Sequence, residues 1–361
     1  MQDITPPNNS PISNTPPFDL INTAAFNTDM AYQHLQRRFG PRVHRNEPLA
    51  QHSAFGVGGT ADIWITVETR DELIGLVSLC AEEHWPLLLI GNGSNIIFTD
   101  AGVRGIVARM TGYDYQINKE PDGKTILSVS AGSSWPRLAY ELALLGWGGV
   151  EFGIGIPGTL GAGIVSNAGA HNQELGEVLE SIDVLDARGC NIEGDSLSLP
   201  IRRRYTKDEL DLAYRYSRFR AGHESVFDEQ NNILPVPHLL IEPAEIVMTL
   251  SIRLHQETPQ KLMEKLRQYQ QERKELEPLH NHTGPIFKDP PGQQASKLIE
   301  QAGMKGFSMG TVQVSDRNAN YIVNKGGATT SDILSLIKEM RRRVQDKCNV
   351  KLELNVELRG E

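Results

Sequence analysis

The sequence lacks the features that would place it in a membrane or in an oxidising compartment. No apolar run reaches the about 18 residues that a membrane-spanning helix needs, and no basic stretch followed by an apolar one marks a secretion signal. The three cysteines, Cys80, Cys190 and Cys348, are odd in number and far apart, so neither a disulfide framework nor a zinc site is expected. These absences predict a cytoplasmic protein without a membrane partner.

Basic residues are also too few to form a general nucleic-acid surface. The formal net charge is -9, which argues against a nucleic-acid partner but leaves room for a local basic pocket that binds a phosphorylated small molecule. His280-Asn281-His282 has the spacing of a metal pair, but such a pattern is usually a polar loop, and no metal is expected. The 361 residues fit two or three domains, and nothing in them indicates an oligomeric state.

The order of predicted elements is mixed, with strands and helices alternating after a polar tail. Residues 1–28 are rich in Pro, Asn, Thr and Ser, which predicts disorder. A polar helix at 259–274 marks the main boundary, so that 29–258 and 259–361 are the expected domains. Apolar periodicity and flanking Pro and Gly residues predict helices at 31–39, 71–83, 134–146, 293–302 and 332–346, and strands at 62–67, 87–90, 126–129, 182–185, 245–254, 321–324 and 350–358. Gly303 and Ser331 are the expected caps of the last two helices.

Two glycine-rich segments are the candidate ligand sites. The first, Gly91-Asn92-Gly93-Ser94-Asn95, directly follows the apolar strand at 87–90. Its glycines allow a tight turn whose N–H groups point at one spot, which suits a diphosphate; a simple turn is the alternative. The second, residues 153–169, contains so many small residues that a flat ligand could approach its backbone closely. The same small residues would let a short helix pack tightly on a sheet. We expect both.

The formal GxGxxG match at 153–158 is not interpreted as a Rossmann fingerprint. No clear apolar strand precedes it, and Pro157 lies inside the turn. The sequence also contains no GxxxxGK[ST] pattern, which excludes a P-loop.

An ordered set of motifs resembles the MurB family of UDP-N-acetylenolpyruvoylglucosamine reductases. The matching stretches cover about residues 45–360: FGVGGTAD at 55–62, GNGSN at 91–95, GIPGT at 155–159, NAGA at 167–170, AYRYS at 213–217, FKDP at 287–290, AGMKG at 302–306 and ATTSD at 328–332. No tyrosine-bearing insertion is evident near 259–284, which favours the shorter subclass of the family.

The resemblance implies an α+β fold, with a two-part FAD-binding region of the vanillyl-alcohol-oxidase (PCMH) type at 29–258 and a C-terminal α/β substrate domain at 259–361. It also implies that NADPH reduces FAD, which then reduces UDP-N-acetylglucosamine-enolpyruvate to UDP-N-acetylmuramate for peptidoglycan synthesis. The residues implied in FAD binding come from both glycine segments: Gly91, Asn92, Gly93, Ser94, Asn95, Gly155, Pro157, Gly158, Thr159, Gly163, Ser166, Asn167, Gly169 and Ala170.

The resemblance also assigns the substrate site. Hydride addition to the enolpyruvyl group builds negative charge next to a carboxylate, and a guanidinium held there stabilises the transition state. Arg215 is the matching cation, preceded by Tyr214; the alternative is an arginine on a solvated strand face. Tyr214, Lys288 and Asp289 are the implied substrate contacts. Asp289 stands where the family has asparagine, and would repel a diphosphate unless a neighbour such as Lys288 neutralises it.

Two positions depart from the family at the acid catalysts. Pro285 occupies the place of the proton-donating serine, and Asn355 that of a glutamate; neither residue is a general acid. Thr283, His282 or water could replace the serine. Glu353 and Glu357 could assist Asn355, since alternate residues of a strand share a face, although a solvated face is an equal alternative. Asn318 stands where the shorter subclass often has histidine.

These departures leave three hypotheses. The first is an active reductase whose site residues are Arg215, Glu353, Asn355 and Thr283. The second is a catalytically impaired homologue that binds FAD or a nucleotide, and the third is an FAD oxidoreductase with another substrate. Arg215 and the Phe-Lys-Asp-Pro loop favour the first hypothesis. Residues 222–242 are longer than is usual for the family.

Overall fold

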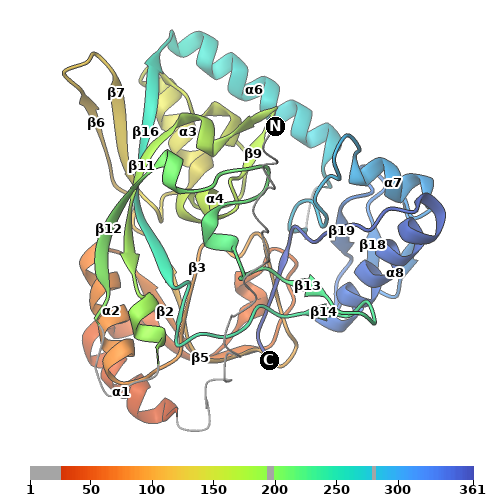
Figure 1. Cartoon of the computed structure of the whole chain (residues 1–361), viewed down its shortest axis with the longest axis horizontal. Coiled ribbons are helices and arrows are strands. Elements are labelled where there is room, and N and C mark those ends of the chain that lie inside the picture. The colour runs from red at the N-terminus through yellow and green to blue at the C-terminus, as the bar shows by residue number, and fades with distance from the viewer. Residues whose placement is uncertain (1–25, 193–198, 279–281) are drawn as a thin grey trace, which may run out of the picture.

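The computed structural model describes residues 26–192, 199–278 and 282–361. Residues 1–25 of the expected tail lie outside this part of the chain. The helix α1, Thr28–Phe39, is capped by the side chain of Asn27, so residues 27 and 28 belong to a helix and not to a disordered tail. Two sheets and a smaller C-terminal block make up the fold (Figure 1). No helix of the described residues has the length and apolar character needed to cross a membrane.

The first sheet contains the apolar strand that precedes the first glycine loop. Its order is β1-β2-β5-β3-β15, and all neighbours except β1 and β2 are parallel. Parallel strands are usually buried on both faces: Ile63 and Ile65 face the core covered by α1 and α2, whereas Trp64 and Leu88 face the opposite core. The bounds are β1 Val43–Pro48, β2 Thr60–Val67, β5 Val103–Met110, β3 Leu87–Ile90, β15 Ile241–Glu242 and α2 Arg70–Glu82.

The second sheet is antiparallel, and the second glycine segment packs against it. Its order is β12-β11-β16-β7-β6, with the short β8 beside β16. Trp135, Leu160 and Leu262 anchor α3, α4 and α6 in one core with this sheet. The bounds are β12 Ile201–Thr206, β11 Leu179–Asp186, β16 Glu245–Gln256, β7 Thr125–Ser130, β6 Tyr115–Lys119, β8 Trp147–Gly148, α3 Trp135–Leu144, α4 Leu160–Val165 and α6 Pro259–Leu276.

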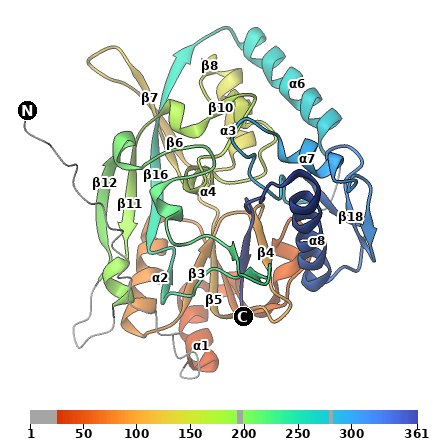
Figure 2. The ribbon, with the colours of Figure 1, turned by 45° about the vertical axis from the view of Figure 1, so that its right-hand side comes forward.

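The C-terminal block has its own core, in which two helices cover a small sheet of order β17-β18-β19. Figure 2 shows α6 leading from the second sheet toward this block, and the chain end returning to the centre of the molecule. There β20 pairs in parallel with β4, the strand that follows the first glycine loop. The bounds are α7 Ala295–Gln301, α8 Thr330–Cys348, β17 Ser308–Met309, β18 Val312–Val314, β19 Ile322–Asn324, β20 Glu357–Arg359 and β4 Ile96–Phe98.

Short elements complete the chain. Residues 222–242 contain a small antiparallel hairpin of β13 and β14 before they reach β15. The remaining bounds are β13 Val226–Phe227, β14 Ile233–Leu234, β9 Gly169–Ala170, β10 Gln173–Glu174, α5 Leu175–Val178, and the 3₁₀ turns Gly40–Arg42, Leu49–His52, Glu151–Gly153, Arg188–Asn191, Lys207–Glu209 and Arg218–Arg220.

The structure confirms most predicted elements and corrects two. Gly303 follows α7 with a φ of 74°, as a C-terminal cap requires. However, α8 is capped by Thr329, whose side chain and that of Asp332 form a capping box, and not by Ser331. The strand predicted at 350–358 is regular only over Glu357–Arg359; before it, Leu354 forms a single bridge to Phe287. The domain boundary at 258/259 stays a prediction, since α6 packs on the core of the second sheet.

Candidate active site

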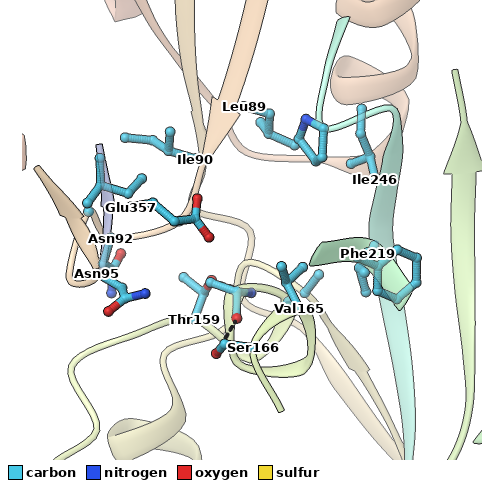
Figure 3. A pocket seen from close by; sticks show the side chains of 18 of the residues that line it. Leu89, Ile90, Asn92, Asn95, Thr159, Val165, Ser166, Phe219, Ile246 and Glu357 are labelled. Atoms are coloured by element: carbon cyan, nitrogen blue, oxygen red, sulfur yellow. Dashed lines mark hydrogen bonds between the residues drawn. The ribbon is translucent and has the colours of Figure 1, made fainter. Parts of the chain in front are cut away.

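A cavity lies where the two sheets and the end of the chain meet. Its walls are the end of β3 with the loop that follows, the start of α4, the 3₁₀ turn Arg218–Arg220, the start of β16 and the strand β20. Figure 3 shows the carboxylate of Glu357 pointing into the cavity between Ile90 and Thr159. Both glycine segments identified from the sequence therefore border one space.

The first glycine loop lines this cavity and has unused backbone N–H groups. Gly91, Asn92, Gly93, Ser94 and Asn95 all line it. None of their five N–H groups donates a hydrogen bond to another part of the described chain. Gly93 has a φ of 62°, and a Cβ there would overlap the carbonyl of His52, so only glycine fits. Free N–H groups beside a pocket suit an anion, which is the role that the sequence predicted for this loop.

The second glycine segment meets the first across the cavity. Asn92 Nδ2 donates to the carbonyl of Pro157 at 3.4 Å, and a Cβ on Gly158 would lie 3.5 Å from Ser94 Oγ. Thr159 caps α4 by accepting a bond from the N–H of Ala162. Thr159 and Ser166 line the cavity, but Gly155, Pro157, Gly158, Gly163, Asn167, Gly169 and Ala170 are not among its lining residues.

The side chain of Asn167 has a structural partner at every polar atom. It is buried, donates to Glu174 Oε2 and to the carbonyl of Ala213, and accepts from the N–H of Gly176. These bonds attach the glycine segment to the Tyr214-Arg215 turn.

Arg215 lies in a tight turn and not on a strand face. The N–H and C=O groups of Ala213 and Tyr216 bond each other in both directions, and Arg215 between them has a φ of 54°. A left-handed conformation is strained for arginine and is often retained at functional sites. The guanidinium donates to the carbonyl of Gly169 at 3.3 Å. The turn thus places Arg215 against the end of the glycine segment.

Two buried oxygen atoms lack hydrogen-bond partners near the substituted catalytic positions. Thr283 and Asn355 are both buried, and neither Thr283 Oγ1 nor Asn355 Oδ1 has a hydrogen-bond partner in the described residues. Asn355 Nδ2 donates to the carbonyl of Pro285 at 3.0 Å, and its N–H donates to Ile286. Buried polar atoms normally find a partner, so these two point to a bound group at this place.

The charged neighbours of the Phe-Lys-Asp-Pro loop differ from expectation. Lys288 Nζ pairs with Glu224 at 2.9 Å and does not neutralise Asp289. Asp289 instead accepts a bond at 2.8 Å from the N–H of Ala295 at the start of α7, and its other oxygen lies 3.5 Å from the hydroxyl of Tyr214. Glu353 is exposed whereas Asn355 is buried, because the alternation of exposed and buried residues at 351–354 stops at Asn355. The Glu353 carbonyl accepts from the N–H of Lys288.

Three charged cavity residues, Arg220, Arg359 and Glu242, were missed in the sequence, whereas Glu357 was considered as a partner of Asn355. Arg220 is 1% exposed, and its Nη2 donates to the carbonyl of Asn355. Glu357, Arg359 and Glu242 also line the cavity, where Arg359 pairs with both carboxylates. Burial lowers the pKa of His223, another lining residue. The Glu357-x-Arg359 spacing was a usable signal, since two-residue spacing puts both side chains on one strand face.

Comparison with known proteins decides the family. A family model described as UDP-N-acetylenolpyruvoylglucosamine reductase, C-terminal domain, matches residues 276–359, and one described as FAD binding domain matches residues 61–193. UDP-N-acetylenolpyruvoylglucosamine reductase 2 of Symbiobacterium thermophilum is 38% identical over 88% of this chain and 92% of its own length. The chain belongs to the UDP-N-acetylenolpyruvoylglucosamine reductase family.

Other members of this reductase family agree. The reductase of Caldanaerobacter subterraneus subsp. tengcongensis is 33% identical over 89% of this chain and 94% of its own length. The crystal structure of MurB from Thermus caldophilus superposes with a TM-score of 0.64 at 30% identity, and covers 88% of this chain and 97% of that one. The MurB-type α+β fold with a PCMH-type FAD-binding region is therefore confirmed, and FAD is the cofactor.

The residues present fit this cofactor. Residues 91–95 line the cavity, and their free N–H groups suit its diphosphate. A Cβ at Gly91 would lie 2.9 Å from Thr159 Oγ1, so a side chain at residue 91 would crowd Thr159. In the part of the chain described, no group of His, Cys, Asp or Glu could hold a metal ion.

Proposed function

We propose that this chain is an NADPH-dependent reductase that converts UDP-N-acetylglucosamine-enolpyruvate to UDP-N-acetylmuramate. The observation that carries the proposal is Arg215, held in a strained turn by the glycine segment that borders the FAD cavity. A protein that only bound FAD would not need this cation. The small-molecule partner is thus a UDP-sugar, and we place the reaction in the cytoplasm, where widely separated cysteines fit a reducing environment.

Bound FAD, once reduced by NADPH, supplies the hydride. We assign the grip on its diphosphate to the first glycine loop and to Thr159 and Ser166 of the second segment, which line the cavity. The more distant Gly155, Pro157, Gly158, Gly163, Asn167, Gly169 and Ala170 support this wall through backbone packing.

Arg215 acts on the charge that develops in the substrate. When hydride reaches the terminal carbon of the enolpyruvyl group, negative charge builds on the neighbouring carbon and spreads into its carboxylate. A guanidinium against that carboxylate stabilises the transition state more than the ground state. Tyr214, Lys288 and Asp289 are the proposed substrate contacts beside it.

Thr283 is the proposed proton donor in place of the missing serine. Its buried hydroxyl has no partner in the described chain, so its proton is free to form the new C–H bond, and the alkoxide regains a proton from solvent. Asn355 cannot donate in this way, but its unpartnered Oδ1 can accept a bond that orients the substrate. The proposed role of Asn355 is thus orientation of the substrate, whereas Glu353 faces solvent and is assigned no role.

Stopped-flow absorbance of the flavin tests this function. NADPH should bleach the flavin of the purified protein, and the enolpyruvyl substrate should restore its colour. Bleaching without restoration would show an impaired homologue or a different acceptor, and a protein without flavin would exclude all of these functions.

A further inference from the structure

A ladder of alternating charges connects the substrate loop with the FAD cavity. It starts at Lys288, passes through the fully buried Arg220, and ends beyond Arg359. Successive partners are joined at 2.9 Å (Lys288–Glu224), 3.0 Å (Glu224–Arg220), 3.8 Å (Arg220–Glu357), 2.9 Å (Glu357–Arg359), 2.5 Å (Arg359–Glu242) and 3.4 Å (Glu242–His238). Arg220 and Arg359 each lie between two carboxylates, whereas Lys288 pairs with Glu224 alone, so removing Glu224 leaves Lys288 without its partner.

Residues 222–242, here called the strap, supply three members of this ladder. The strap leaves the cavity wall after Arg220 and crosses to the C-terminal block. There Asn231 Nδ2 donates to the carbonyl of Lys338 at 3.3 Å, Lys338 Nζ donates to Asn232 at 2.6 Å, and Arg341 lies 4.0 Å above the ring of Phe227. The strap is therefore attached to α8.

The strap is also attached to β20 and to the first sheet. Ser225 Oγ accepts from the N–H of Leu358 at 2.7 Å, and the N–H of Val236 donates to the Leu358 carbonyl at 3.0 Å. At its end, β15 pairs with β3. Glu224 directly precedes Ser225, so these bonds fix its carboxylate between the domains.

The burial of Arg220 explains why the site requires this carboxylate. A guanidinium that is 1% exposed must be paired with negative charge. Its Nη2 donates at 3.3 Å to the backbone carbonyl of Asn355, which carries no net charge. The carboxylate of Glu224 lies 3.0 Å from Arg220 Nε and at the same time holds Lys288.

We propose that Glu224 is a positioning residue for the reductase reaction, whose carboxylate orders the buried Arg220 and fixes Lys288 toward the substrate. This inference rests on the proposed function. Glu224 acts through Lys288 and neither binds FAD nor donates the proton. The strap thus gives this chain a means of orienting the substrate.

The test compares Glu224→Gln with Glu229→Gln in the purified holoenzyme. Glu229 lies in the same strap but is exposed and has no ion pair among the described residues. We expect Glu224→Gln to lower kcat/KM for flavin reoxidation by the enolpyruvyl substrate about tenfold to a hundredfold, mostly through KM. FAD content and the rate of bleaching by NADPH should stay within about twofold, and Glu224→Asp should recover part of the loss. Glu229→Gln should match the wild type.

A double variant separates positioning from a structural role. If Glu224 acts through Lys288, Glu224→Gln combined with Lys288→Met should be no slower than Lys288→Met alone. Fully additive losses, or a parallel loss of FAD and bleaching, would overturn the inference. A wild type that bleaches but is not reoxidised would refute the proposed function and this inference together, whereas an active wild type with an unaffected Glu224→Gln would refute only the role of Glu224.

Discussion

Replacing Arg215 gives the most direct test of the proposed chemistry. Its guanidinium donates one bond to the described chain, at 3.3 Å to Gly169, which leaves its other donors for a substrate carboxylate. Loss of one donor to a developing negative charge lowers kcat by about 10²–10³-fold, or roughly 3–4 kcal/mol. We expect Arg215→Ala to slow flavin reoxidation by that factor. Folding should lose only about 1 kcal/mol or less, because a single long hydrogen bond disappears.

The φ of 54° at Arg215 provides a matched control. Glycine relieves about 1–2 kcal/mol of left-handed strain but adds roughly 0.4–1 kcal/mol of entropy to the unfolded chain. Arg215→Gly should therefore be as stable as Arg215→Ala or slightly more stable in urea unfolding, yet equally slow in stopped-flow reoxidation. A rate that recovered with the stability of the glycine variant, or a loss of FAD equal to the loss of rate, would refute the catalytic role.

Three further predictions concern the proton donor, the glycine loop and acid stability. Thr283→Val keeps the shape of the side chain but removes its free hydroxyl; reoxidation should slow by about 10²-fold or more, with bleaching by NADPH unchanged, and an unaltered rate would identify water as the donor. Gly93→Ala should lose FAD and several kcal/mol of stability, of which strain alone accounts for on the order of 1–3 kcal/mol. Gly123→Ala, at a glycine with a similar φ but nothing within 4 Å, should retain FAD. Equal FAD affinity of the two variants would contradict the close approach seen at residue 93. The hydrogen bond from Arg42 lowers the pKa of Glu72 from 4.5 to about 2. The resulting stabilisation of the folded state is complete above pH 4.5 and is lost as the pH falls toward 2. Glu72→Gln should flatten that part of the acid-unfolding curve, and identical curves for the variant and the wild type would exclude the Arg42–Glu72 pair as its cause.

Local signals predicted where the first glycine loop lies, whereas seven of the residues predicted to bind FAD do not line the cavity. The apolar strand at 87–90 and the glycines after it are close in sequence, so the turn and its free N–H groups follow from residue types alone. Arg215 was found through a motif, but its left-handed turn was not, since no glycine or asparagine marks that position. The interpretation of residues 153–158 as something other than a Rossmann turn agrees with the 3₁₀ turn at Glu151–Gly153.

Contacts between distant segments were beyond local reasoning. Leu352 to Asn355 have the alternation of a strand, yet their backbone partner is a bridge to Phe287, and regular pairing starts only where β20 meets β4. Lys288 was expected to neutralise its sequence neighbour Asp289. Its actual partner is Glu224, and this contact depends on how the strap packs, which local sequence patterns do not reveal. The N–H of Ala295 satisfies Asp289 instead, so this carboxylate has a local structural partner.

The buried Arg220 links the charge balance of the site to the strap. Its Nη2 donates to the backbone carbonyl of Asn355, a contact that does not depend on the side chain at that position, so the charge of the guanidinium must be balanced by carboxylates from elsewhere. An unpaired guanidinium in such a place is costly, and Glu224 at 3.0 Å and Glu357 at 3.8 Å are its partners. Since Glu224 also pairs with Lys288, a change at residue 224 should disturb both cations. Proton donation, which we propose for the neutral hydroxyl of Thr283, is separate from this charge balance.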